Sequence, residues 1–171
     1  MSKVKVLMRE VVVPYHPVFK KTPELCDIGL EFPHYFNIEA LVEECLAEEG
    51  HYTLVRGDHH DFSDGSDCKT ASIRPTPQRP GSASYKGEIS GVQTASGSTK
   101  MGALRCIIYN PHTFDLMYYY LPNSFWMHNI QLHPTSGIGK VVFSWNDASN
   151  HIPKFKDFQC GSFKELAQAT G

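Results

Sequence analysis

Residues 56–74 bring together side chains that bind metal ions and activate water. The stretch reads RGDHHDFSDGSDCKTASIR and contains aspartates, two adjacent histidines and one lysine. Asp67 and Lys69 stand two positions apart in a predicted strand, so we expect both side chains on one face. A carboxylate there can hold a divalent cation, while the lysine positions the attacking water and helps to deprotonate it. This pattern is typical of metal-assisted phosphodiester hydrolysis.

A second carboxylate from a neighbouring segment would complete an oxygen site for Mg²⁺. Asp58 lies nine residues before Asp67, and the sequence SDGSD at 63–67 has turn chemistry. The chain can therefore reverse between the two aspartates and bring Asp58 beside Asp67.

Asp58 followed by Asp67-Cys68-Lys69 resembles the PD-(D/E)XK nuclease superfamily, which includes many type II restriction endonucleases and the mismatch-repair nicking endonuclease. In that superfamily an aspartate is followed by an acidic-x-Lys motif on the next strand, and a helix glutamate often adds a ligand. The resemblance implies Asp58 and Asp67 as catalytic metal ligands and Lys69 as the catalytic lysine. It also implies Glu44 as the helix ligand.

This sequence departs from the superfamily pattern at several positions. Gly57 stands where the pattern has proline, and Asp61 and Asp64 compete with Asp58 for the same role. Glu48 is the alternate to Glu44, because helical phase places it nearer the edge of the apolar face.

Two other interpretations account for the same residues. The acidic stretch can be an exposed turn, with a plain cross-strand ion pair to explain the face that Lys69 shares with Asp67, in a non-catalytic nucleic-acid- or protein-binding module. The residues Asp58-His59-His60 also resemble the DHH phosphoesterases, which bind manganese. The further motifs of that family are not found in this chain, and neighbouring histidines on an extended segment point to opposite faces.

Basic residues follow the acidic stretch and are interleaved with serine, threonine and glycine. Such residues can follow a DNA backbone through its phosphates. The alternative is a surface insertion without a ligand. The predicted DNA-binding residues are Arg74, Arg79, Lys86, Lys100 and Arg105.

The composition excludes several classes of protein. The chain has 171 residues and a net charge of −2, which suits one domain, residues 1–171, without a global basic field. The five cysteines are widely spaced and contain no CxxC pair, which argues against a disulfide framework or a cysteine-rich zinc site. The first residues resemble neither a signal peptide nor a membrane span, so we expect a cytoplasmic protein without membrane association.

The pattern of apolar residues predicts an α+β fold with a mixed central sheet flanked by helices, similar to the restriction-endonuclease core. A helix is expected over 37–50, capped by Asn37 and closed by Gly50. A second helix is expected over 162–170, where Ser162 and Glu165 form a capping box. The predicted strands cover 3–13, 51–56, 67–74, 87–92, 103–110, 115–122, 124–132 and 139–146.

Together these features predict a small Mg²⁺-dependent DNA endonuclease, with Mn²⁺ as a possible substitute, of the restriction, homing or phage type. The superfamily's usual chemistry would leave a 5′-phosphate. Because a chain of this size seldom encloses a duplex alone, a homodimer that cuts both strands is expected.

Overall fold

The computed structural model describes residues 38–55, 60–93, 102–113, 115–146 and 150–171, with the side chains of 38–41 left out. The predicted strand at 3–13 and the expected cap Asn37 lie outside these residues. Among the described residues, no helix has the length and apolar character that crossing a lipid bilayer requires.

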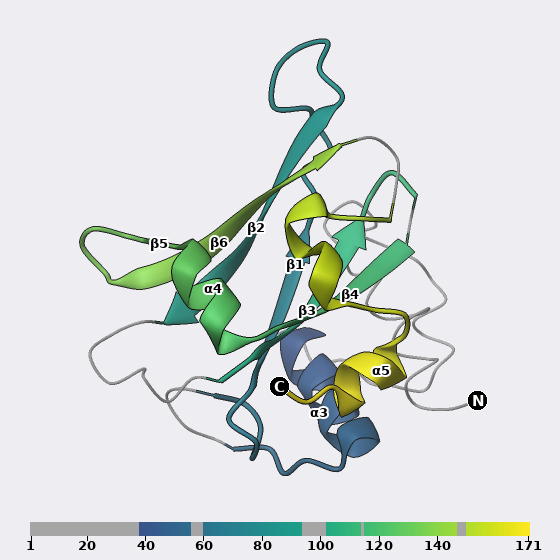
Figure 1. Ribbon diagram of the computed structural model, residues 1–171, viewed down its shortest axis with the longest axis vertical. Helices are drawn as coiled ribbons and strands as arrows, with labels where there is room; N and C mark the ends of the chain where they lie inside the picture. The colour runs from purple at the N-terminus through teal and green to yellow at the C-terminus, as the bar shows by residue number, and fades with distance from the viewer. Residues whose placement is uncertain (1–37, 56–59, 94–101, 114, 147–149) are drawn as a thin grey trace.

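Two sheets form the framework (Figure 1). The first has the order β1-β3-β4-β7, in which β1 runs parallel to β3 and the other pairs are antiparallel. Its strands are β1 (Asp67–Ser72), β3 (Leu104–Asn110), β4 (Asp115–Leu121) and β7 (Gln159–Cys160). The second is antiparallel, with the order β2-β6-β5: β2 (Ser84–Gln93), β6 (Ile138–Asn146) and β5 (Ile130–Leu132).

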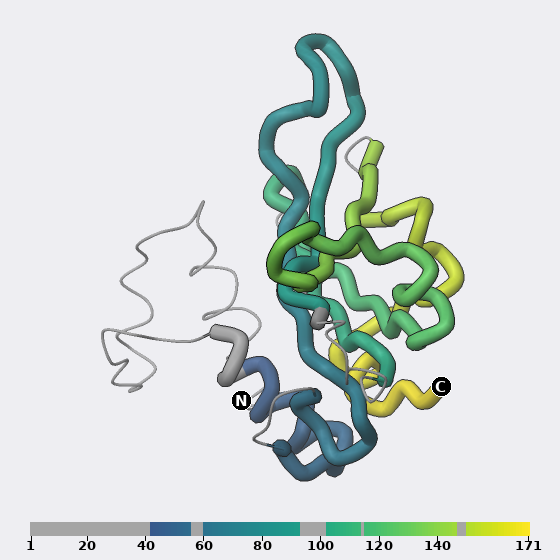
Figure 2. Tube along the Cα trace, turned by 90° about the vertical axis from the view of Figure 1, so that its left-hand side faces the viewer, coloured from purple at the N-terminus to yellow at the C-terminus, as the bar shows by residue number. Residues whose placement is uncertain are grey.

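The chain passes from the first sheet to the second at the end of β1. Ile73 forms an isolated antiparallel bridge with Gly87, and the Arg74 amide donates to the Lys86 carbonyl at 2.8 Å. The connection that follows, residues 75–83, projects beyond the rest of the structure (Figure 2). β1 therefore contributes to the first sheet at one end and leads into a projecting hairpin at the other.

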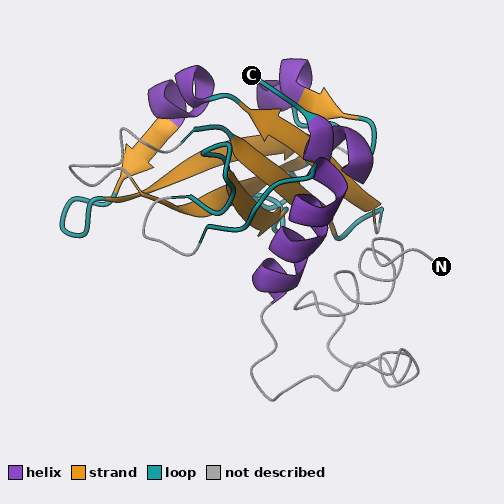
Figure 3. Ribbon diagram, turned by 90° about the horizontal axis from the view of Figure 1, so that it is seen from below, coloured by secondary structure: helices purple, strands orange, loops and turns teal. Residues whose placement is uncertain are grey.

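β3 is buried along its whole length because both faces of the first sheet are covered. One face packs against α3 (Ile38–Gly50) and α5 (Phe163–Gln168), with Ile107 in that core. The other face packs against the second sheet, α4 (Asn123–Asn129) and the 3₁₀-helix η5 (Pro153–Phe158). The first sheet therefore lies between α3 and α5 on one face and the second sheet, α4 and η5 on the other, and Figure 3 shows the helices beside the strands.

Alternation along β4 divides its side chains between these two cores. Met117, Tyr119 and Leu121 are buried on the side of the second sheet. Tyr118 and Tyr120 are half-buried on the side of α3 and α5. The period of two residues in a strand therefore divides the three consecutive tyrosines between the two faces.

α3 and α5 pack against each other at a point where no side chain fits. A Cβ atom at Gly50 would lie 2.2 Å from a ring carbon of Tyr52 and 2.5 Å from the Ala167 carbonyl oxygen. The left-handed residue that ends α3 is His51, with φ of 58°. Gly50 thus allows the two helices to pack closely. The sequence predicted that Gly50 closes the helix, but the residue that does so is His51.

The α+β class is confirmed, and so are the strands at 87–92, 103–110 and 115–122 and the cap of α5. The Ser162 hydroxyl accepts the Glu165 amide at 3.1 Å. The prediction of a strand over 124–132 is wrong for most of its length, because residues 123–129 are helical and bury Trp126. The segment 51–56 contributes only a bridge between Leu54 and Phe62. The sequence predicted one central sheet flanked by helices, whereas a second sheet packs together with helices on one face of the first.

Candidate active site

Asp67 and Lys69 form an ion pair at the beginning of β1. The Lys69 ammonium lies 2.8 Å from Asp67 Oδ2, and the side chains are 15% and 6% exposed. In the parallel register Asp67 stands beside Leu104 and Lys69 beside Cys106, so both lie on the sheet face that is turned toward the second sheet. Cys68, between them, is buried in the opposite core. As the sequence predicted, the carboxylate and the ammonium share one face.

Asp61 provides a second carboxylate at this point. Its Oδ2 accepts the backbone N–H of Cys68 at 2.7 Å, and its carboxyl group is close enough to Asp67 to raise the pKa of that residue. The sequence pattern assigned this place to Asp58 and named Asp61 as a competitor. Asp58 lies outside the described residues, whereas the described part of the loop brings Asp61 to Asp67.

The loop at 61–66 holds Asp61 in place through backbone bonds. The amides of Asp61 and Phe62 both donate to the Ser66 carbonyl at 3.1 Å, and the Gly65 amide donates to the Phe62 carbonyl at 2.9 Å. Gly65 has φ of 85°, a left-handed conformation in which glycine is favoured. Phe62 is fully buried and anchors the loop to the core.

The surroundings of Asp67 disfavour its charge. Burial and, second, the hydrogen bond with Asp61 raise the pKa of Asp67 to about 8, and the ion pair with Lys69 opposes this rise only in part. Two carboxyl groups in contact cannot both ionise without cost, because their charges repel. Burial and the neighbouring carboxyl thus both disfavour the charged form of Asp67, and a divalent cation bound there would favour it.

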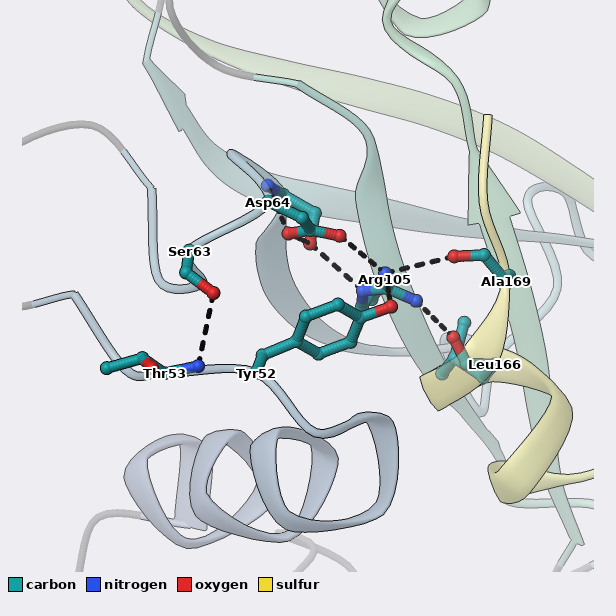
Figure 4. Close-up of polar contacts among 8 residues, drawn as sticks. Tyr52, Thr53, Ser63, Asp64, Arg105, Leu166 and Ala169 are labelled. Carbon is teal, nitrogen blue, oxygen red and sulfur yellow. Dashed lines mark hydrogen bonds and ion pairs between the residues drawn. The ribbon is translucent and has the colours of Figure 1, made fainter.

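Asp64 points away from this pair and contacts Arg105. The Asp64 carboxylate lies 2.7 Å from the Arg105 guanidinium and also accepts the Ser66 amide and hydroxyl (Figure 4). Partial burial alone would raise the pKa of Asp64, but the hydrogen bonds from Ser66 and the charge of Arg105 hold it below its usual value. Asp64 therefore serves the loop and does not join Asp61 and Asp67.

Neither Glu44 nor Glu48, the two glutamates proposed as ligands from α3, joins the carboxylate pair. Glu44 and Glu48 are both exposed. Within the described ranges, no three His, Cys, Asp or Glu side chains gather so that they could hold a metal ion. His60, half-buried beside Asp61, has a buried Nδ1 without a hydrogen-bond partner among the described residues. The predicted ligand Glu44 thus gains no support from the structure, while Asp61 and Asp67 form a pair.

The basic residues fall into two groups. Arg74 and Arg79 are exposed and Lys86 is half-exposed on the projecting hairpin, where Arg74 and Lys86 line a pocket of about 290 Å³ together with Thr76 and Gln78. Lys100 lies outside the described residues. The expectation that Arg105 binds DNA is wrong, because its side chain is completely buried and its guanidinium is held by protein groups.

Sequence reasoning named Asp61 only as a competitor and placed Arg105 on the surface, although both residues carried a signal. Asp61 carried a signal: it precedes Phe62, a large apolar residue that fixes the loop, whereas Asp58 follows a glycine. Arg105 also carried one, since it stands within ALRCIIYN, an apolar strand in which each neighbour is buried. An arginine in such a strand indicates an internal ion pair and not a surface contact.

Comparison of the chain with models of protein families gave no match, and comparison with curated proteins gave none either.

Proposed function

We propose that this protein is a Mg²⁺-dependent DNA endonuclease with a restriction-endonuclease-like core of the PD-(D/E)XK kind. The observation that carries the proposal is the convergence of Asp61, Asp67 and Lys69 at the beginning of β1. Two carboxylates and one lysine are the side chains that this chemistry needs. Asp61 takes the role that the sequence pattern assigned to Asp58.

The donor set fits a hard divalent cation. Mg²⁺ is bound in many phosphoryl-transfer sites by one or two carboxylates, with substrate phosphate and water completing its shell. Asp61 and Asp67 supply two carboxylates, and burial, followed by the neighbouring Asp61, raises the pKa of Asp67 against the opposing effect of Lys69. When bound, the cation would polarise the scissile phosphate and lower the pKa of a coordinated water. Mn²⁺, with the same preference for oxygen, is expected to substitute.

Lys69 contributes its ammonium group to the reaction. Its Nζ hydrogens can orient the attacking water and a phosphate oxygen, and its charge offsets the negative charge that develops on the phosphate. Asp67 fixes Lys69 by the ion pair of 2.8 Å. The Cys68 amide fixes Asp61, so both functional carboxylates are held by the first residues of one strand. Attack in line with the leaving 3′ oxygen would leave a 5′-phosphate.

The projecting hairpin offers a surface for the DNA backbone. Arg74 and Lys86 stand opposite each other on it; Arg74 and Lys140 form ion pairs with Glu88, and the charge of Lys86 also acts on that carboxylate. Three positive charges around one negative charge leave an excess that attracts phosphate. The pocket at the base of the hairpin has no acidic lining residue, which suits a phosphate group.

Removing two of the three hairpin cations should weaken DNA binding and make it less sensitive to salt. For Arg74→Ala combined with Lys86→Ala, we expect the slope of log K against log salt to become shallower by about 0.9 for each phosphate that the variant no longer neutralises. Fluorescence anisotropy with a labelled duplex at several salt concentrations measures this slope. Lys164→Ala, an exposed lysine on α5, is the matched control. An unchanged slope in the double variant would exclude Arg74 and Lys86 from the DNA interface.

A homodimer is the arrangement we expect for cutting both strands, since each chain carries one site. Sedimentation in the presence of a duplex should give two chains per DNA. A single chain per duplex, together with nicks and no linear product, would contradict the dimer.

The proposed function is tested by incubating the purified protein with supercoiled plasmid. We expect conversion to nicked or linear DNA with Mg²⁺ or Mn²⁺ and none with a chelator. A non-catalytic binding module would instead retard the plasmid equally with and without metal. Metal-dependent phosphoesterase activity that survives both Asp67→Asn and Lys69→Ala would favour the DHH-like alternative.

A further inference from the structure

Arg105 is a buried cation that the proposed reaction does not use. Its side chain is 0% exposed, and its neighbours in β3 are apolar and buried as well. Taking a guanidinium out of water is costly unless its hydrogen bonds and charge are satisfied. A methionine or leucine at such a position often gives equal stability. The presence of arginine therefore calls for a role beyond packing.

The guanidinium joins three segments that are distant in the sequence (Figure 4). Its Nε donates to Ser66 Oγ at 2.9 Å, and its Nη2 lies 2.7 Å from Asp64 Oδ2. Its other contacts are the carbonyls of Leu166 and Ala169 at the end of α5, and the hydroxyl of Tyr52 after α3. The rings of Tyr52 and Tyr120 lie 4.7 and 5.1 Å from its Cζ.

Two of these contacts, those with Ser66 and Asp64, connect Arg105 to the proposed catalytic carboxylates of Asp61 and Asp67. Ser66 is held by Arg105 through its hydroxyl and by Asp64 through its amide and hydroxyl. The carbonyl of Ser66 accepts the Asp61 amide, and the next residue is Asp67. Arg105 is thus connected to both carboxylates through Ser66, while its own side chain lies on the opposite face of the sheet.

We propose that Arg105 is a positioning residue: by holding Asp64 and Ser66 it keeps the loop at 61–66 folded so that Asp61 remains against Asp67. One consequence is that cation binding and cleavage depend on Arg105, and this consequence rests on the proposed function. The geometric part, the position of Asp61, can be measured without any activity.

The geometric part is read from hydrogen exchange of the Cys68 amide, which donates to Asp61 Oδ2. Arg105→Met should loosen the loop and speed this exchange, while amides in β4 keep their wild-type rates. Because Arg105→Met can fail to fold, Asp64→Asn and Ser66→Ala test the same connection with the arginine retained. Arg105→Lys, which keeps the charge but not the fork of donors, should restore the slow exchange only in part.

The functional part is read from Mn²⁺ binding, followed by the electron paramagnetic resonance signal of the free ion, and from plasmid cleavage. Loss of a residue that orients a metal ligand commonly lowers metal affinity about 10- to 100-fold. We expect about a tenfold loss or more in Arg105→Met and Asp64→Asn. The control is Ile108→Ala, which removes a buried side chain of the same strand on the other face. It should lower the melting temperature and leave Mn²⁺ affinity unchanged.

The outcomes separate this inference from the proposed function. Wild-type exchange of the Cys68 amide in folded Asp64→Asn and Ser66→Ala overturns the positioning role of Arg105, whatever the activity. Faster exchange in these variants, with a wild-type protein that neither binds Mn²⁺ nor cleaves DNA, supports the positioning role and overturns the nuclease. An equal loss of Mn²⁺ affinity in Ile108→Ala would show that stability alone is responsible, and would also overturn the inference.

Discussion

Replacing Lys69 by alanine should reduce Mg²⁺-dependent cleavage of plasmid by about 10²- to 10⁴-fold, the range in which a positioned acid–base group contributes. The ammonium that orients the water and offsets the charge on the phosphate is removed, while Asp61 and Asp67 remain. Lys69 is partly exposed, so the fold should tolerate the change. The measurement is the initial rate of nicking at saturating Mg²⁺, and circular dichroism verifies the fold.

Two controls make the Lys69 result specific. Lys164→Ala removes an exposed lysine of α5 and should leave the rate unchanged. Lys69→Arg keeps the charge but changes the position of the donors, so its rate should fall between those of the wild type and Lys69→Ala. A folded Lys69→Ala that cleaves at the wild-type rate would remove this residue from the mechanism.

The second large effect concerns stability and pH. Asp67 has a pKa of about 8 in the folded protein, against an ordinary aspartate value of 3.8. The native state therefore binds the proton more tightly than the unfolded state, and the free energy of unfolding should fall as pH rises from about 4 to about 8.

Asp67→Asn should abolish this part of the pH dependence. Asparagine is nearly isosteric with the protonated carboxyl, so the variant should match the wild type near pH 4 and exceed its stability near pH 9. Urea unfolding at several pH values gives the difference between the two proteins, in which the titration of unrelated histidines cancels. Equal pH dependence in both would mean that Asp67 ionises freely in the folded state.

A divalent cation should reverse the loss of stability at high pH. An ion that binds only the native state stabilises it by mass action. Above pH 8 the carboxyl group of Asp67 is ionised in the native state and can bind the ion. Mn²⁺ at pH 9 should therefore raise the melting temperature of the wild type and not that of Asp67→Asn.

Local patterns in the sequence were sufficient for much of the fold. β3 and β4 follow from an apolar run and from alternation, and α5 follows from its capping box. The segment 124–132 was misread because a short run of mixed apolar residues fits a strand and a helix equally well. The parallel pairing of β1 with β3, which leaves β2 in a separate sheet, depends on contacts between distant segments that no local pattern encodes.

The site was predictable where one element determines it. Asp67 and Lys69 share a face because side chains alternate along a strand, and the structure bears this out. The choice between Asp58, Asp61 and Asp64 depends on how the loop folds, and that is decided by Phe62, Gly65 and the buried Arg105. The sequence placed Arg105 on the surface because its partners, above all the carbonyls at the end of α5, are about sixty residues away along the chain.

Asp61 and Asp67 should together hold one divalent cation beside Lys69, and the rest of the proposed mechanism depends on that ion. Diffraction at the manganese absorption edge, from crystals grown with Mn²⁺ near pH 9, locates it directly. We predict an anomalous peak within about 2.5 Å of a carboxylate oxygen of each aspartate, the distance of a bound hard cation. A peak elsewhere in the chain, with both carboxylates free of metal in crystals that contain bound Mn²⁺, would contradict it.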